Sequence, residues 1–349
     1  MSTARWKNRP DGSNWGDFGE DDQLGRLNLL TPERTRAAVA EVVDGISFCL
    51  SLPLDLPGGN VLNPNRYPPQ LRPTRRHGAM GLNFRLARVD ALHTDVLSDD
   101  VAVLHLQYST QWDGLAHVGS MHDVHGDGVL RAVYYNGYAA DEHVVASCDD
   151  AGDIDAQGAN VRSRALALGI EHMAEKAVQG RGVMVDLQAH FGQGRHIVGM
   201  DDLHQVLVAD GIAVEEGDIL CLHTGFADAV LAMDGTPDAS VLAQTGCVLD
   251  GRDADLLKWI SESGVAAIVA DNYAVEAYPA RSMGPACCAA LPLHEHCLFK
   301  LGVHLGELWH LGPLARHLRE QGRYRFLLTA PPLRLPGAIA SPMTPVATV

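Results

Sequence analysis

The sequence predicts an α/β protein built on a sheet with flanking helices. In its second half, short apolar runs typical of strands alternate with amphipathic segments typical of helices, which favours an α/β or α+β sheet. The chain has 349 residues, of which 46% are hydrophobic and 20% charged, with 35 glycines and 18 prolines. This loop-rich globular composition excludes coiled-coil, collagen-like and disordered proteins. Because no repeat, low-complexity tract or clear linker is visible, we predict a single domain over residues 1–349.

About the first fifty residues are predicted to wrap over this domain as an extension. The first thirty are polar and turn-rich, with Trp6 and Trp15 placed to anchor the segment. Thr31 is a favourable N-cap and Gly45 a favourable C-terminal residue, so a helix is expected between them. Residues 52–75 are rich in Pro, Asn and Gly and are expected to form a long irregular loop.

The remainder of the chain is predicted to alternate between strands and helices. Apolar runs indicate strands at 101–106, 182–187, 218–222, 265–270 and 324–328. Amphipathic spacing indicates helices at 201–209, 253–263 and 314–320.

Charge and cysteine content restrict the partners. Lys and Arg number 27 against 43 Asp and Glu, which gives a net charge of −16 and disfavours nucleic-acid binding. Seven cysteines without a C-x-x-C spacing indicate reduced thiols rather than a disulfide framework. No apolar h-region or bilayer-length apolar run occurs, so we expect a cytoplasmic protein without a membrane partner.

The first candidate site is the polar segment 107–117, which follows the strand expected at 101–106. Phosphate-loop, zincin and nucleophile-elbow motifs are all missing from the sequence. Asp113 and His117 could both be metal ligands, or one a ligand and the other a base. The spacing alone also fits the alternative that Asp113 is an ordinary loop aspartate and His117 a structural histidine.

A second candidate cluster combines Pro292-Leu293-His294-Glu295-His296 with the later Glu307. If His294 and His296 lie in a strand, they share a face and could complete a site; alternatively they are surface histidines. His122, His125, His190 and His196 are equally open between site contacts and bystanders. Cys221 fits a core position, and no base is evident for Cys287-Cys288.

The segment 107–117, QYSTQWDGLAH, resembles the H-x-G-T-H-x-D-x-P-x-H signature of the cyclase family, which includes bacterial-type kynurenine formamidase and isatin hydrolase. The chain keeps Thr110, Asp113 and His117 of that signature, but has Gln107 and Gln111 at its two early histidine positions. T-Q-W-D with the later Y-N-G-Y at 135–138 is similar to a longer branch of the family. The likeness runs from about residue 12 to the C-terminal segments PLH, LGVHLGE, RYRFLLTAPPLRL and SPMTPVA, and includes the stretch Asp271 to Glu276.

This resemblance implies a cyclase-like swivelling β/β/α fold with a mixed, barrel-like sheet and flanking helices. It also implies a metal-dependent hydrolase in which Asp113 and Glu307 are ligands and His117 is the acid/base. His294 is the first choice for the remaining ligand and His296 the second. Because an amide oxygen is a poorer ligand than imidazole, we expect one divalent ion, Zn²⁺ or Mn²⁺, with Gln111 or Gln107 near it.

The leading function is therefore hydrolysis of a small cyclic or acylated substrate, an amide, lactam or lactone, by metal-bound water. Alternatives are a lactone hydrolase or cyclase acting on C–O bonds only, and a catalytically silent small-molecule binding protein. Trp112, Tyr135 and Tyr138 either line the substrate pocket or pack in the core. We expect a homodimer or homotetramer.

Overall fold

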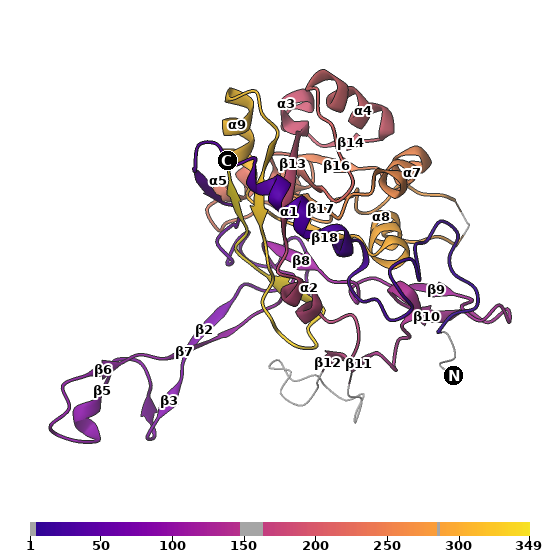
Figure 1. The fold of residues 1–349 in the computed structure, drawn as a ribbon. Coiled ribbons are helices and arrows are strands. Elements are labelled where there is room, and N and C mark those ends of the chain that lie inside the picture. Colours follow the sequence, from indigo (N-terminus) through magenta and orange to yellow (C-terminus); the bar gives the residue numbers. More distant parts are fainter. Residues whose placement is uncertain (1–4, 147–162, 285–286) are drawn as a thin grey trace.

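The computed structural model describes residues 5–146, 163–284 and 287–349, and it confirms the predicted α/β class (Figure 1). Nine of the strands in these segments form one curled, mixed sheet that holds the centre of the molecule. In spatial order they are β1 (Ser47–Cys49), β21 (Val346–Thr348), β19 (Arg325–Thr329), β13 (Gln179–Asp186), β15 (Ile219–His223), β17 (Ala267–Ala270), β18 (His304–Glu307), β8 (Gln111–Asp113) and β20 (Ala340–Pro342).

The middle of this sheet is parallel and its flanks are antiparallel. Strands β13, β15, β17 and β18 run in the same direction, and β8 pairs antiparallel with both β18 and β20. Every residue of β15 and β17 is buried, as expected for parallel strands covered on both faces. Alternate residues of β15 enter different cores: Leu220 and Leu222 pack on one side, Ile219 and Cys221 on the other.

Helices cover both faces of the sheet. They are α1 (Pro32–Val39), α2 (Ile170–Lys176), α3 (Leu187–Phe191), α4 (Met200–Ala209), α5 (Phe226–Ala232), α6 (Ala239–Leu242), α7 (Ala254–Ser263), α8 (Pro292–His294) and α9 (Gly312–Glu320). The described residues also form the 3₁₀ turns η1 (Gly25–Leu29), η2 (Leu86–Arg88) and η3 (Tyr135–Gly137) and the π-helix η4 (Glu295–Leu301). The apolar sides of α4 and α7 pack into one core and that of α9 into the other.

Local sequence signals explain where several helices begin and end. Asp253 caps α7 through its carboxylate, which accepts from the N–H groups of Asp255 and Leu256, and Gly264 closes the helix at a φ of 68°. The Thr31 hydroxyl caps α1 as predicted. However, α1 ends at Val39 rather than near Gly45, and Val43 beyond it is 73% exposed, so the segment after α1 offers little apolar packing to extend the helix.

A long β-arm, defined here as residues 70–103, projects from the body (Figure 1). Its base is the antiparallel ribbon of β2 (Gln70–Pro73) and β7 (Asp100–Val103), and its outer part holds β3 (Arg75–Arg76), β4 (Ala79–Met80), β5 (Phe84–Arg85) and β6 (Val96–Leu97). The strand expected at 101–106 is therefore shorter, exposed and part of this arm, and it does not lead into the core sheet. The loop expected over 52–75 likewise gives way to β2 at Gln70.

Three further two-stranded pairs complete the described strands: β9 (Ser120–His122) with β10 (Arg131–Val133), β11 (Val144–Ala146) with β12 (Ser163–Ala165), and β14 (His196–Val198) with β16 (Cys247–Leu249).

The described part of the N-terminal segment lies against the body. Trp15 is fully buried and donates from its indole nitrogen to the Phe299 carbonyl oxygen at 2.7 Å, and Arg26 donates to the carbonyl oxygens of Ile260 and Ser261. Among the residues that the structure describes, no helix combines the length and apolarity needed to cross a membrane.

Candidate metal centre

Two neighbouring strands bring Gln111, Asp113 and Glu307 to one place. In the pairing of β8 with β18, Gln111 lies opposite Glu307 and Asp113 lies opposite Leu305. Since side chains alternate along a strand, Gln111, Asp113 and Glu307 share one face of the sheet. Within the candidate segment 107–117, Gln111–Asp113 thus form a buried strand, which fixes their side chains more rigidly than a loop would.

His294 enters this face from the short helix α8. Its Nε2 lies 3.2 Å from Glu307 Oε1 and 3.9 Å from Asp113 Oδ2. One ligand atom from each of Asp113, His294 and Glu307 lies within 4.8 Å of the others, and all three residues are buried. The structure therefore brings together the three residues expected to be the principal ligands.

Glu276 holds the His294 ring in this orientation. Its carboxylate accepts from the backbone N–H groups of Leu293 and His294 and lies 2.8 Å from His294 Nδ1. A carboxylate on the second ring nitrogen of a ligand histidine fixes the tautomer that leaves Nε2 free for a metal. Glu276 lies in the family-like stretch of the sequence, but no local spacing links it to His294, so the sequence predicts no role for it.

The backbone before Glu276 is strained. Ala274 and Val275 have φ angles of 74° and 57°. A β-branched residue rarely adopts a positive φ, and such strain persists where the surrounding structure imposes it, often at functional sites. Here the two left-handed residues direct the Glu276 carboxylate towards α8.

Burial and neighbouring charges shift the pKa values of the three converging side chains in different directions. Burial opposes the protonated form of His294, but hydrogen bonds with Glu276 and Glu307 and their charges raise its pKa to about 10. Burial also opposes the charge of Glu307, yet the hydrogen bond with His294 holds its pKa below the ordinary value. For Asp113, burial dominates and raises the pKa.

The donor set fits a divalent cation. Asp113 Oδ2 and Gln111 Oε1 are buried and have no hydrogen-bond partner among the described residues. The Gln111 amide nitrogen lies 3.2 Å from Asp113 Oδ1 and 3.3 Å from Glu307 Oε2, so it separates two buried carboxylates. Two carboxylates and one imidazole around a small buried volume match the donors that Zn²⁺ and Mn²⁺ accept.

His117 and Gln107 lie beside the three converging residues. His117 Nε2 is 3.9 Å from Asp113 Oδ1, and its side chain keeps 20% of its surface exposed. The Gln107 amide nitrogen lies 3.5 Å from His117 Nδ1. Gln107 belongs to the irregular segment between β7 and β8. The ring centres of His117 and His294 lie 6.4 Å apart.

The interpretation of His294 and His296 as same-face strand residues is wrong. The segment is helical, with α8 followed by η4, so positions two apart point in different directions. His296 Nε2 lies 2.9 Å from the Ser261 hydroxyl, and burial with the nearby Lys300 charge lowers its pKa to about 4. Within the described residues, His296 is no member of the ligand group.

The aromatic residues expected to line a pocket or pack in the core are all buried. Trp112 lies on the opposite sheet face from Asp113, donates to the Ala330 carbonyl oxygen and packs edge-on against Trp309. The Tyr135 hydroxyl donates to the Asp22 carboxylate and the Tyr138 hydroxyl to the Asp21 carbonyl oxygen. Their contacts correspond to the packing alternative.

The four histidines left open lie in other surroundings. His122 contacts the Asn8 carbonyl oxygen, His125 is exposed, and His190 and His196 pair with Asp210 and Asp202 respectively. The structure places none of these four in the group formed by Asp113, His294 and Glu307.

Comparison with known proteins agrees with this fold. The family model described as "Putative cyclase" matches residues 50–277. The chain is 31% identical to a solved protein described as a novel cyclase, with 97% of each chain covered and a TM-score of 0.71. This mixed α/β chain therefore belongs to the cyclase family.

More distant structures share the fold. Isatin hydrolase A from Labrenzia aggregata is 11% identical, with a TM-score of 0.54 over 90% of this chain and 98% of that one. Isatin hydrolase A from Ralstonia solanacearum is 13% identical, with the same TM-score over 91% and 98%. No curated protein matches the chain.

Proposed function

We propose that this chain is a metal-dependent hydrolase of a small cyclic or acylated substrate. One divalent ion, Zn²⁺ or Mn²⁺, would be held by Asp113, His294 and Glu307. The observation that carries the proposal is the convergence of these three buried side chains, with Glu276 orienting the imidazole. The shared fold of two isatin hydrolases supports a hydrolase.

The ion, when bound, supplies a water of lowered pKa and polarises the substrate carbonyl. The remaining chemistry belongs to the chain. His117 is the acid/base: it is partly exposed, lies next to Asp113, and can deliver a proton to the leaving group. Gln107 adjoins His117 Nδ1 and restricts the ring's rotation.

Arg66 is a further candidate for substrate contact. One guanidinium nitrogen donates to the Gln107 carbonyl oxygen at 2.8 Å, and the charge of Arg66 favours the ionised forms of both Asp113 and Glu307. Arg66, Gln107 and Tyr273 line one small cavity. We propose that Arg66 attracts the negative charge that develops on the substrate carbonyl or on the product carboxylate.

Metal analysis joined to a hydrolysis screen tests the proposal. Protein purified without chelators should contain about one divalent ion per chain. It should hydrolyse at least one member of a panel of arylformamides, lactams and unsaturated lactones. Two fully occupied ions in anomalous density around Asp113 would contradict the expected metal count.

The same screen separates the alternatives. Turnover restricted to lactones would identify a C–O specific enzyme. A stoichiometric ion without turnover of any substrate would favour the binding protein. Absence of a bound ion from protein reconstituted with either metal would remove the basis of both hydrolase hypotheses and leave the binding protein.

A further inference from the structure

A cavity of about 170 Å³ adjoins the small cavity that Arg66 lines. The two cavities share Val61, Leu62 and Tyr273 in their walls. Arg195 lines the larger of the two but not the smaller. This larger space, here called the Arg195 cavity, is also lined by Asn272, Tyr273, Glu276 and Tyr278.

The Arg195 cavity lies next to the candidate metal centre. Glu276, which orients the ligand His294, forms part of its wall. Burial raises the pKa of the Tyr273 hydroxyl, and the negative charge of Glu307 raises it further, so this ring lies close enough to a metal ligand to sense its charge. A molecule whose reacting carbonyl lies at the metal centre can therefore extend into the Arg195 cavity.

Arg195 brings a positive charge to this cavity without a counter-ion. Burial lowers the pKa of its guanidinium, and among the described residues no carboxylate charge offsets that effect. Arg181, which is also partly buried, pairs instead with Glu215 and Asp218. A partly buried charge without a partner is costly, and an anion supplied by a ligand would offset the cost.

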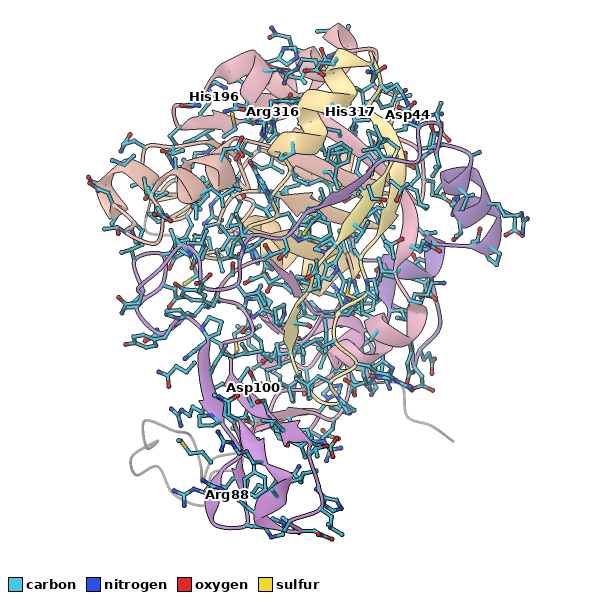
Figure 2. All side chains as sticks on the ribbon, turned by 90° about the vertical axis from the view of Figure 1, so that its left-hand side faces the viewer. Asp44, Arg88, Asp100, His196, Arg316 and His317 are labelled. Atoms are coloured by element: carbon cyan, nitrogen blue, oxygen red, sulfur yellow. The ribbon has the colours of Figure 1, made fainter. Side chains whose placement is uncertain are left out.

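The backbone that carries Arg195 is fixed by strand pairing. The Arg195 N–H donates to the Gln244 carbonyl oxygen at 2.8 Å, next to the pairing of β14 with β16. Figure 2 shows the following residue, His196, on the upper part of the body, away from the β-arm that holds Arg88 and Asp100. A guanidinium on a paired backbone is preorganised for binding, because the chain that positions it is already ordered.

Asn272 supplies an unused acceptor to the same cavity. Its amide nitrogen donates to the Cys247 carbonyl oxygen at 2.7 Å, and a carbonyl can only accept, so the amide orientation is settled. The remaining atom, Oδ1, is buried and has no hydrogen-bond partner among the described residues. Apolar walls from Phe226, Leu242 and Val248 surround these polar groups, as is typical of a pocket for a small molecule.

The charge of the whole chain makes the position of Arg195 informative. A net charge of −16 gives the protein no general attraction for anions, so an anionic ligand must be held by local cations. One guanidinium matches the two oxygens of a carboxylate in a bidentate pair. A phosphate usually calls for further donors, and Arg195 is the one lysine or arginine in the wall of this cavity.

We propose that the substrate of this chain carries a carboxylate remote from its scissile bond and that Arg195 binds this carboxylate. The Asn272 carbonyl oxygen accepts a hydrogen bond from an N–H or O–H group of the same molecule. Arg195 is then a specificity-determining residue that selects anionic amides, lactams or lactones over neutral ones. The inference rests on the proposed hydrolase function for calling the ligand a substrate, whereas binding of a carboxylate to Arg195 is measurable without turnover.

Isothermal titration calorimetry of chelator-treated protein tests the binding step, since no ion is then present to hold the probe or to hydrolyse it. The probes are meta-formamidobenzoate and its neutral analogue meta-formamidobenzamide. Wild-type protein should bind the carboxylate more tightly than the carboxamide. Arg195→Gln should raise the Kd of the carboxylate by roughly 10–100-fold, the usual effect of losing a charge-assisted hydrogen bond, and should not change that of the carboxamide.

Two further variants control for charge and folding. Arg36→Gln removes the same charge from an exposed position on α1 and should leave both Kd values unchanged. Arg195→Lys keeps the charge and should restore part of the affinity for the carboxylate. Equal Kd values of the two probes in wild-type protein, equal losses in Arg195→Gln and Arg36→Gln, or stronger competition by inorganic phosphate than by benzoate would overturn the proposal.

Turnover by the metal-loaded protein separates this inference from the proposed function. Addition of water to the formamide should release formate and the aniline, and the preference in kcat/KM for the carboxylate probe should fall by roughly 10-fold or more in Arg195→Gln. Hydrolysis of both probes with equal kcat/KM would contradict the role of Arg195 and leave the hydrolase intact. Preferential binding of the carboxylate without turnover would support the role of Arg195 and count against the hydrolase.

Discussion

His294 and Glu276 illustrate how one side chain acquires a function from another. The Glu276 carboxylate satisfies two backbone N–H groups of α8 and the His294 ring at once. That arrangement sets the position of the helix start and the direction of Nε2 together. Glu276 is therefore a positioning residue, and its effect should appear in metal affinity.

We predict that Glu276→Gln weakens metal binding by roughly 10–100-fold, as loss of such outer partners typically does. The matched control is Glu295→Gln, since Glu295 follows His294 directly but accepts from Ser120 instead. Competition titration with a chromogenic chelator measures both. Equal losses in the two variants would show that Glu276 has no special role.

The choice between the two histidines can be tested directly. His294→Ala should lose the metal and activity together, whereas His296→Ala should keep both, because its ring pairs with Ser261. Metal content by inductively coupled plasma mass spectrometry decides the assignment. Retention of the ion by His294→Ala alone would reverse it.

Variants of His117 and Asp113 should distinguish the loss of catalysis from the loss of metal binding. His117→Ala should keep most of the metal but lower kcat by ~10²–10⁴, the usual contribution of a positioned proton shuttle. Asp113→Ala should strip the metal, because it removes an anionic ligand. Near-complete loss of the ion from His117→Ala would make His117 a ligand rather than the acid/base.

At the scale of elements, Asp253 joins two helices. One carboxylate oxygen caps α7 through Asp255 and Leu256, and the other accepts from the Met200 N–H at the start of α4. We predict that Asp253→Ala lowers the free energy of unfolding by about 2 kcal/mol, at the upper end for one cap. Urea denaturation measures the change. Asp238→Ala, which caps only α6, is the control and should cost less.

Sequence signals predicted those elements that carry their own boundary residues. Helix α7 agrees with the expected segment 253–263 because Asp253 and Gly264 mark its ends, and the apolar runs of β13, β15 and β17 also lie where expected. Strand β8 was missed because Gln111–Asp113 is polar and is buried only through pairing with β18 and β20. Tertiary pairing of that kind leaves no local pattern.

The candidate metal centre was likewise predicted only in part. Asp113, His294 and Glu307 were named from the family signature, and the structure brings them together. Glu276 and Arg66 were given no role, since their positions depend on a strained turn and on a loop beside the arm. The β-arm was not predicted: its two ends fell in the loop expected over 52–75 and the strand expected at 101–106, and exposed and buried aliphatic strands have similar sequences.

For the whole molecule, the pKa of about 10 for His294 predicts how stability depends on pH. Because that pKa is above the ordinary value near 6.5, the charged ring stabilises the metal-free fold fully below about pH 6.5. This contribution is lost as pH rises towards 10. The metal requires the neutral ring, so its affinity should increase over the same range.

Differential scanning calorimetry between pH 7 and 10, with chelator and with Zn²⁺, measures this pH dependence of stability and of metal affinity. The Tm difference between the metal-bound and metal-free protein should widen as pH rises, and His294→Gln should abolish the widening. A difference that is constant with pH in the wild type would contradict the assignment of the proton to His294.

The position of β8 has a consequence for synthesis on the ribosome. This short strand carries Asp113, yet its two neighbours, β18 and β20, are translated long after it. The nascent chain must therefore hold Gln111–Asp113 unpaired until most of the polypeptide has emerged. Non-local pairing of this kind is slow to form and exposes strand edges in the meantime. The metal centre would consequently mature late in biogenesis, after the parallel strands β13, β15 and β17 have provided a surface for it.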